Sequence, residues 1–240
     1  MEHLIHFANN IVSLFLAPGM MLALGIAVWG VAYTRSESLA CYARARRMVG
    51  ITFVIYSLAL LAEYFVKSSI AADFATRLVI VAISMSQAYL FTLTLVTLID
   101  VEFLSVRRLR AEAVLPLLAT VAAFTAGTLC PVAWHISIIV AYQVAYALLL
   151  LHYIHLFRRH YAYYEQRMDN YFSDEEQHRL HWVRNSFRWS LGIGVAALVY
   201  SILPCEATSL PFMLAAVSYY TFYGIHFINY AHIFPYVASA

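Results

Sequence analysis

The sequence predicts an all-α integral membrane protein, a seven-helix bundle with its N-terminus outside the membrane and its C-terminus in the cytoplasm. The first observation is composition, since 63% of the 240 residues are hydrophobic and 12% are charged. A soluble domain carries about 25% charged residues. The second is a series of apolar runs, each near the roughly 20 residues that a helix needs to cross a bilayer. The third is the uneven distribution of arginines among the connecting segments, which sets orientation.

Seven apolar runs are candidate spans, and all must be helical because an open strand would leave unpaired amides in hydrocarbon. The predicted spans are approximately 11–33, 48–66, 78–101, 113–129, 135–157, 187–204 and 209–233. Together they form a single transmembrane domain over residues 1–240. The first run lacks a basic n-region and a small-residue cleavage site, so we do not expect it to be a signal peptide.

Two of the predicted spans carry local irregularities. Pro18 and Gly19 fall inside the first span and predict a kink, which a helical bundle can accommodate. The sixth span is short, because only Trp189 to Leu203 is continuously apolar. It becomes long enough if the polar segment before it continues into the membrane as one helix, with Arg188 reaching the interface.

Basic residues are concentrated in alternate connecting segments. Thirteen of the fifteen Lys and Arg residues lie in 34–47, 102–112 and 158–188. The opposite side has only Lys67 and Arg77. Because basic residues in short loops stay in the cytoplasm, this asymmetry predicts an external N-terminus and a cytoplasmic C-terminus for a multi-pass protein.

The longest polar stretch, residues 158–188, is predicted to be a cytoplasmic amphipathic segment. Ser173 and Glu176 fit a capping box, in which each side chain bonds the backbone amide of the other residue. Arg179 and Trp182 continue a helical amphipathic pattern. Two interpretations stay open, which can both hold: a lead-in helix on the anionic inner leaflet, or a coupling segment that passes motion from the spans to an effector.

Cys130 and Cys205 fall in two different loops on the predicted outer side, a compartment that permits disulfides. A bridge between them would tie two interhelical turns together. The alternative is a pair of unrelated thiols, since sequence does not give the geometry that a disulfide needs.

Ten histidines raise the question of a metal or haem site. His152 and His155 share a helix face, and His152 with His226 would suit a bis-histidine haem if they faced each other. No two histidines are adjacent in sequence, and the carboxylates noted near the inner face are Asp100 and Glu102. We therefore expect interfacial or hydrogen-bonded histidines, with no metal and no cofactor. A membrane-embedded enzyme using the histidines and Asp100 is the alternative.

Polar and aromatic residues in the outer halves of the spans are the candidate ligand-binding set. They are Glu63, Ser84, Gln87, Tyr142, Gln143, Tyr146, Tyr219 and Tyr220. In the last span, Tyr219, Tyr223, His226 and Tyr230 form one stripe at helical spacing. Polar groups at membrane depth usually face the bundle interior. They are either interhelical hydrogen bonds and aromatic packing, or an outward-opening pocket with Glu63 as its one buried charge. Glu63 in a surface pair with Lys67 is the alternative for that residue.

Two inner segments resemble a bacterial family. They are the run from Met168 to Glu176 with Arg179-Leu180 and Trp182-Val183 after it, and the run Tyr42-x-Arg44-x-Arg46-Arg47-x-x-Gly50. They are similar to the N-terminal multi-helix membrane sensor region of membrane-anchored AraC-type transcription regulators and sensor histidine kinases. The resemblance covers most of the chain. It implies a sensor in the bacterial inner (cytoplasmic) membrane, whose soluble C-terminal part acts on DNA or phosphate.

The sequence therefore predicts a sensor or signal relay that binds a small ligand from the outer side and passes a conformational change to a cytoplasmic output module. An enzyme is less favoured, since P-loop, GxGxxG and GxSxG motifs are absent. The chain stops at Ala240, so we expect a cytoplasmic output domain that was lost or a separate partner protein that supplies it. No direct nucleic-acid contact is expected from this chain. The lipid bilayer is its main partner, and a homodimer stays open. A small transporter is a further alternative, made less favoured by the lack of a broken-helix repeat.

Overall fold

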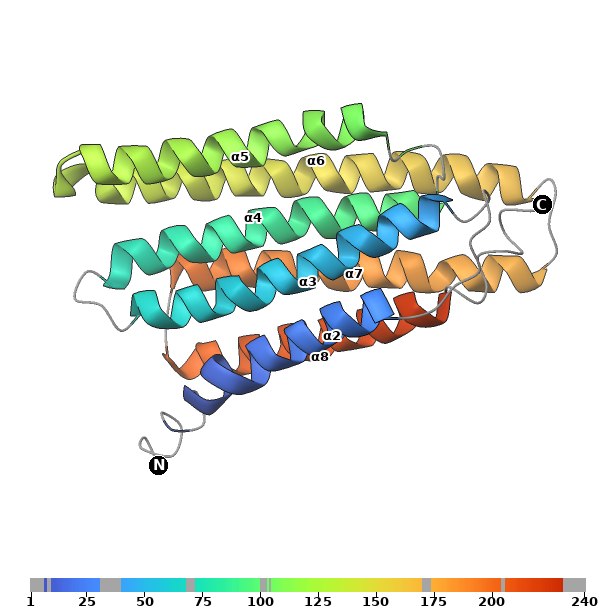
Figure 1. Ribbon diagram of the computed structural model, residues 1–240. Coiled ribbons are helices and arrows are strands. Elements are labelled where there is room, and N and C mark those ends of the chain that lie inside the picture. The colour runs from blue at the N-terminus through green and yellow to red at the C-terminus, as the bar shows by residue number, and fades with distance from the viewer. Residues whose placement is uncertain are drawn as a thin grey trace.

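The computed structural model describes residues 7, 10–30, 40–67, 72–99, 103, 105–169, 174–203 and 206–230, and this part is almost entirely helical (Figure 1). The long helices are α2 (Ala17–Gly30), α3 (Ala40–Lys67), α4 (Ala72–Ile99), α5 (Val106–Leu129), α6 (His135–Asp169), α7 (Asp174–Ile202) and α8 (Glu206–Tyr230). A π-helix, η1 (Val12–Leu16), precedes α2, and a 3₁₀ turn, η3 (Val132–Trp134), precedes α6. For some residues near helix ends, including Glu63 and Lys67, only the backbone is described.

Consecutive helices run antiparallel, and α4 lies at the centre of the bundle. It contacts α3, α5, α6 and α7, while α8 packs against α2 and α7. Every residue from 91 to 99 on α4 is buried. Figure 1 shows α5 and α6 along one edge of the bundle and α2 and α8 along the opposite edge.

Five described segments are long and apolar enough to cross a membrane. They are Val12–Gly30, Ala45–Ala62, Phe74–Ile99, Arg107–Leu129 and Val132–Tyr163. They overlap the first five predicted spans. The outward surface is apolar as well, since Leu115, Leu117 and Leu118 on α5 are all more than half exposed. A contiguous apolar surface of this kind suits lipid rather than water, so the chain has the features of a multi-pass membrane protein.

The helices α7 and α8 do not belong to these five segments. The first half of α7 is polar, and its apolar part begins only near Phe187. α8 carries tyrosines and His226 where a typical span has aliphatic residues. α7 nonetheless packs against α4 and α6, and α8 packs against α2 and α7. The prediction of seven membrane spans requires that α7 and α8 cross the membrane as well, and it stays a prediction.

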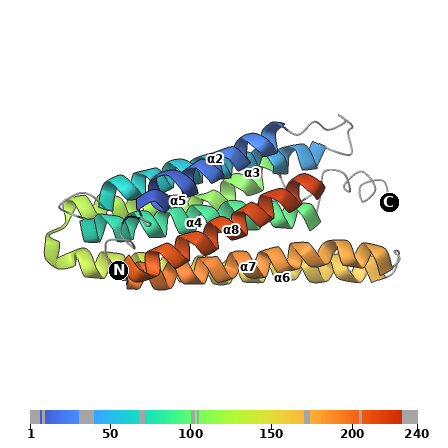
Figure 2. The ribbon, with the colours of Figure 1, turned by 90° about the horizontal axis from the view of Figure 1, so that it is seen from below.

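At one end, α6 and α7 extend beyond the other helices (Figures 1 and 2). We call residues 158–188 of this pair the α6–α7 hairpin. α6 continues to Asp169, past the predicted span end at 157, and α7 starts at Asp174, directly after the predicted capping residue. At the base, the rings of Phe157 and Phe187 stack with centroids 3.8 Å apart. Ser173 and the side chains of Glu176 and Arg179 lie outside the described residues.

The irregularity expected at Pro18 takes the form of the π-helix η1. The amide of Ala17 bonds to the carbonyl of Val12, which widens the turn immediately before the proline. Proline has no N–H to donate to the i−4 carbonyl of an α-helix. The wider π-helical turn, with its i→i−5 hydrogen bond, precedes the position where that bond is missing. The carbonyl of Pro18 accepts a 2.8 Å hydrogen bond from the hydroxyl of Ser57 on α3.

Arginines close helix ends at both ends of the bundle. Arg46 on α3 donates to the carbonyl of Trp29 in the last turn of α2. At the opposite end, Arg77 on α4 donates to the carbonyl of Ile202, the last residue of α7, at 2.9 Å. These carbonyls have no partner within their own helix, and a positive charge also suits the negative end of the helix dipole.

The indole ring of Trp29 lies directly over Gly50 on α3. A Cβ at Gly50 would overlap the indole, whereas a Cβ at Gly192 on α7 would meet nothing within 4 Å. Alanine in a helix is intrinsically better than glycine by about 0.5–1 kcal/mol. The two glycines are therefore expected to respond to the same substitution with opposite signs.

We predict that Gly50→Ala lowers the free energy of unfolding by about 1–3 kcal/mol, because the added methyl group displaces Trp29. The control Gly192→Ala is expected to be neutral or slightly stabilising. Denaturant titration in detergent micelles measures both. Equal effects of the two substitutions would contradict the close α2–α3 contact.

Candidate functional site

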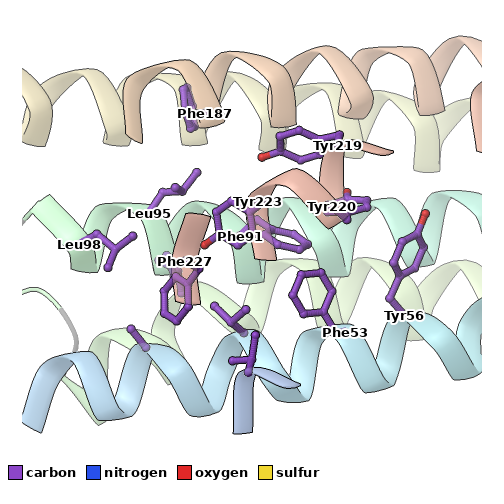
Figure 3. Close-up of a cluster of buried hydrophobic side chains, with 14 of the residues drawn as sticks. Phe53, Tyr56, Phe91, Leu95, Leu98, Phe187, Tyr219, Tyr220, Tyr223 and Phe227 are labelled. Carbon is purple, nitrogen blue, oxygen red and sulfur yellow. The ribbon is translucent and has the colours of Figure 1, made fainter. Parts of the chain in front are cut away.

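Aromatic rings fill the space where α3, α4 and α8 meet (Figure 3). The ring of Tyr220 stacks on Phe91 with centroids 4.7 Å apart and meets Tyr56 edge-on at 5.1 Å. Phe53 and Phe91 form another edge-on pair at 5.8 Å. These geometries are those that aromatic quadrupoles favour. The cluster fixes how α8 sits against α3 and α4.

Two adjacent tyrosines tie α8 to two different helices. The hydroxyl of Tyr219 donates to the backbone carbonyl of Ser186 on α7 at 2.8 Å. The hydroxyl of Tyr220 donates to Oε1 of Gln87 on α4 at 3.1 Å. Successive residues on a helix point about 100° apart, so neighbouring positions reach different partners. Any rotation of α8 would strain both bonds at once.

A groove lies beside Gln87, between α3 and α4. Its volume is about 160 Å³. It is lined by Thr52, Ile55, Tyr56, Ala59, Ala82, Ile83, Ser86, Gln87 and Leu90. None of these side chains is charged. The nitrogen Nε2 of Gln87 is buried and has no hydrogen-bond partner among the described residues. An unsatisfied buried amide of this kind is rare in native structures and calls for an explanation.

The other predicted polar residues form a separate set between α4, α5, α6 and α7. Tyr142 shares a 2.7 Å hydrogen bond with Thr120, and Tyr146 donates to the carbonyl of Gly194 at 3.0 Å. Gln143 donates to Ser201 at 3.1 Å. Ser84 bonds to the carbonyl of Ile80 on its own helix. The bonds of Tyr142, Gln143 and Tyr146 join neighbouring helices, whereas the bond of Ser84 stays within α4.

The predicted ligand-binding residues are thus divided between two places. Gln87 and Tyr220 meet at the groove, with Tyr56 beside them, and Tyr219 faces α7 on the other side of α8. Tyr142, Gln143, Tyr146 and Ser84 belong to the second set. The side chain of Glu63 lies outside the described residues.

The predicted stripe on α8 faces the base of the α6–α7 hairpin. The indole of Trp182, on α7, lies 6.5 Å from the ring of Tyr223 and 6.1 Å from that of His226. The ring of Tyr219 is 6.3 Å from that of Tyr223. A continuous line of side chains therefore runs from the groove, through α8, to Trp182 in the predicted coupling segment. The side chain of Tyr230 lies outside the described residues.

Sequence reasoning missed a hydrogen-bonded contact between a histidine on α6 and a carboxylate on α5. Nε2 of His152 lies 3.0 Å from Oε2 of Glu112. The ring of Tyr153 lies beside that of His152, with centroids 5.4 Å apart. The hydroxyl of Tyr153 is buried, with no hydrogen-bond partner among the described residues. The predicted spans 113–129 and 135–157 share one connection, and counting 17 residues from it along each helix reaches Glu112 and His152, so their similar depth was visible in the sequence.

The described residues include no group of three or more His, Cys, Asp or Glu side chains that could hold a metal ion. His152 and His226 do not face each other, since α6 and α8 lie on opposite edges of the bundle (Figure 1). Nδ1 of His226 lies 3.0 Å from the carbonyl of Phe222 instead. Cys130 is exposed after the end of α5. The bridge predicted for it involves Cys205, which lies outside the described residues, as does Asp100.

Comparison with known protein families, with curated proteins and with solved structures finds no match to this chain.

We predict that Ser201→Ala lowers the free energy of unfolding by about 1 kcal/mol, because it leaves the buried amide of Gln143 without an acceptor. The control Ser86→Ala removes an exposed hydroxyl that bonds only to its own helix, so its expected effect is near zero. Thermal unfolding in detergent compares the two. The double variant Gln143→Leu with Ser201→Ala is expected to recover part of the loss. Equal stabilities of Ser201→Ala and Ser86→Ala would contradict the interhelical bond.

Proposed function

We propose that this chain is a membrane sensor and signal relay. It binds a small ligand within the bundle and passes a conformational change to a cytoplasmic output domain or partner protein. The observation that carries the proposal is the hydrogen bond between Gln87 and Tyr220 at the wall of the α3–α4 groove. A ligand in this groove would act on the same amide that holds α8 to α4.

The path from the groove to the hairpin consists of short, direct steps. Tyr220 is followed by Tyr219, which holds the carbonyl of Ser186 on α7. One turn further along α8, Tyr223 packs against Trp182. A small shift or rotation of α8 would therefore move the start of α7. Helix shifts of about 1–2 Å are a common element of such transitions.

The distribution of charge supports the predicted orientation. Arg46 and Arg47 lie at the start of α3, and Arg107, Arg108 and Arg110 at the start of α5. The hairpin adds Arg158, Arg159, Arg184 and Arg188 at the same end of the bundle (Figure 1). Basic ends of short connections favour the cytoplasm. The protruding hairpin then lies inside the cell, where an output module can reach it.

The resemblance to membrane regions of AraC-type regulators and sensor kinases favours the same role. Two positions of the inner sequence motif, Arg46 and Gly50, contact Trp29 in the structure. These two positions of the motif therefore hold α3 against the end of α2. A location in the bacterial inner membrane with seven spans, an external N-terminus and a cytoplasmic C-terminus is part of this proposal.

The relay can be tested without a ligand by measuring the distance between two spin labels. In a cysteine-free background, the labels are attached to Arg47→Cys on α3 and His181→Cys on α7, two exposed positions. We predict that Tyr220→Phe shifts the mean distance between the labels by about 1–2 Å, or broadens its distribution, because α8 loses its bond to α4. Pulsed electron resonance in lipid nanodiscs measures the distance.

The matched control is Tyr142→Phe, which removes an interhelical hydrogen bond of the second set. That bond joins α5 to α6, away from α8, so the label distance should stay as in the parent protein. The relay is wrong if Tyr220→Phe leaves the distance unchanged while the protein remains folded, or if both substitutions change it equally.

A further inference from the structure

We infer that the α3–α4 groove binds a neutral, membrane-soluble molecule whose head carries a hydrogen-bond acceptor, such as a ketone or quinone-type carbonyl. The molecule enters from the hydrocarbon phase, between the two helices. This inference rests on the proposed function and names the class of ligand. It follows from the depth of the groove, its lining, its free donor and its size.

The groove lies at mid-membrane depth. Gln87 is in the middle of the apolar segment Phe74–Ile99, and Ile55 is in the middle of Ala45–Ala62. On α3 the groove is flanked by Ile51, Ile55 and Leu58, which are exposed on the outside of the bundle by 45–62%. A face of this kind meets acyl chains when the helices span a bilayer. The groove therefore opens sideways to lipid, and its occupant must be soluble there.

The lining specifies a neutral ligand with an acceptor. Its polar hydroxyls on Thr52 and Ser86 already donate to carbonyls of their own helices at 2.7 and 2.9 Å. Nε2 of Gln87 is a buried donor of this lining with no hydrogen-bond partner among the described residues. The terminal torsion of a glutamine has a broad energy profile, so a modest rotation brings this N–H into the groove. A charged ligand would find no counter-charge in the lining and would carry a large desolvation cost.

The size of the groove limits the head group. Its volume of about 160 Å³ is close to that of an apolar protein cavity of about 150 Å³ that binds benzene. A head about the size of one six-membered ring with a carbonyl fits this space. An alkyl tail would leave through the open side and lie along the exposed isoleucines of α3.

Two matched probes test the inference: decanophenone, which has a phenyl ring, a ketone and an alkyl tail, and decylbenzene, which lacks the ketone. Each is added to the full chain in lipid nanodiscs, and the shift of the unfolding temperature Tm against probe concentration gives its affinity. We expect the ketone to bind the parent protein about fivefold or more tightly than the hydrocarbon, since one hydrogen bond is gained.

Variants assign the contacts. In Gln87→Leu the two probes should bind equally, and Ala59→Leu, which fills the groove, should weaken both. Gln87→Met keeps the length of the side chain and makes the same test if the leucine variant unfolds. The control Tyr142→Phe removes a hydroxyl between α5 and α6, outside the groove lining, and should leave the ketone preference intact.

The inference is overturned if the parent protein binds both probes equally, if neither binds, or if Gln87→Leu retains the preference for the ketone. The spin-label experiment uses no ligand, so loss of probe binding with an intact Tyr220 effect would reject the ligand class and leave the relay standing.

Discussion

The packing of the helices depends on the hydrogen bonds that the buried polar side chains of α8 make with neighbouring helices. A hydroxyl that is buried in an apolar environment without a hydrogen-bond partner costs free energy. α8 carries the buried tyrosines Tyr219, Tyr220 and Tyr223. Tyr219 and Tyr220 solve this by bonding to the carbonyl of Ser186 and to Gln87. In the proposed seven-span bundle, lipid supplies no hydrophobic drive between helices, so such bonds and close ring packing would determine the position of α8.

The two polar sets of the bundle differ in how completely their hydrogen bonds are satisfied, and we propose that the ligand binds at the less satisfied set. Between α5, α6 and α7, the side chains of Tyr142, Gln143 and Tyr146 all have partners on a neighbouring helix. At the groove, the amide of Gln87 is only half satisfied. Partly satisfied polar networks in a low dielectric are costly, so an added acceptor at Nε2 of Gln87 would stabilise the groove.

Hydropathy predicted the helices well but their ends poorly. The spans at 78–101 and 113–129 correspond to α4 and α5, which begin several residues earlier because polar residues, including Arg77 and Arg107, continue the helices past the apolar runs. α6 runs on because Tyr153, Phe157 and Tyr161 keep one face packed after the hydropathy falls. The stripe on α8 was visible in the spacing of polar residues, and Gln87 was among the polar residues predicted to face the bundle interior. The groove was not, because it arises from small and aliphatic residues of two helices whose rotation only packing determines.

The most direct test of the account is whether α8 crosses the membrane, since the relay requires it to lead from the groove to the inner hairpin. In a cysteine-free background, Leu203→Cys lies just after α7, before α8, and Asn229→Cys lies at the end of α8, both exposed. A membrane-impermeant maleimide is applied to intact spheroplasts and to permeabilised ones. The account predicts labelling at position 203 in both, and at position 229 only after permeabilisation. Labelling of both positions from the same side would show that α8 does not span, and would contradict the relay.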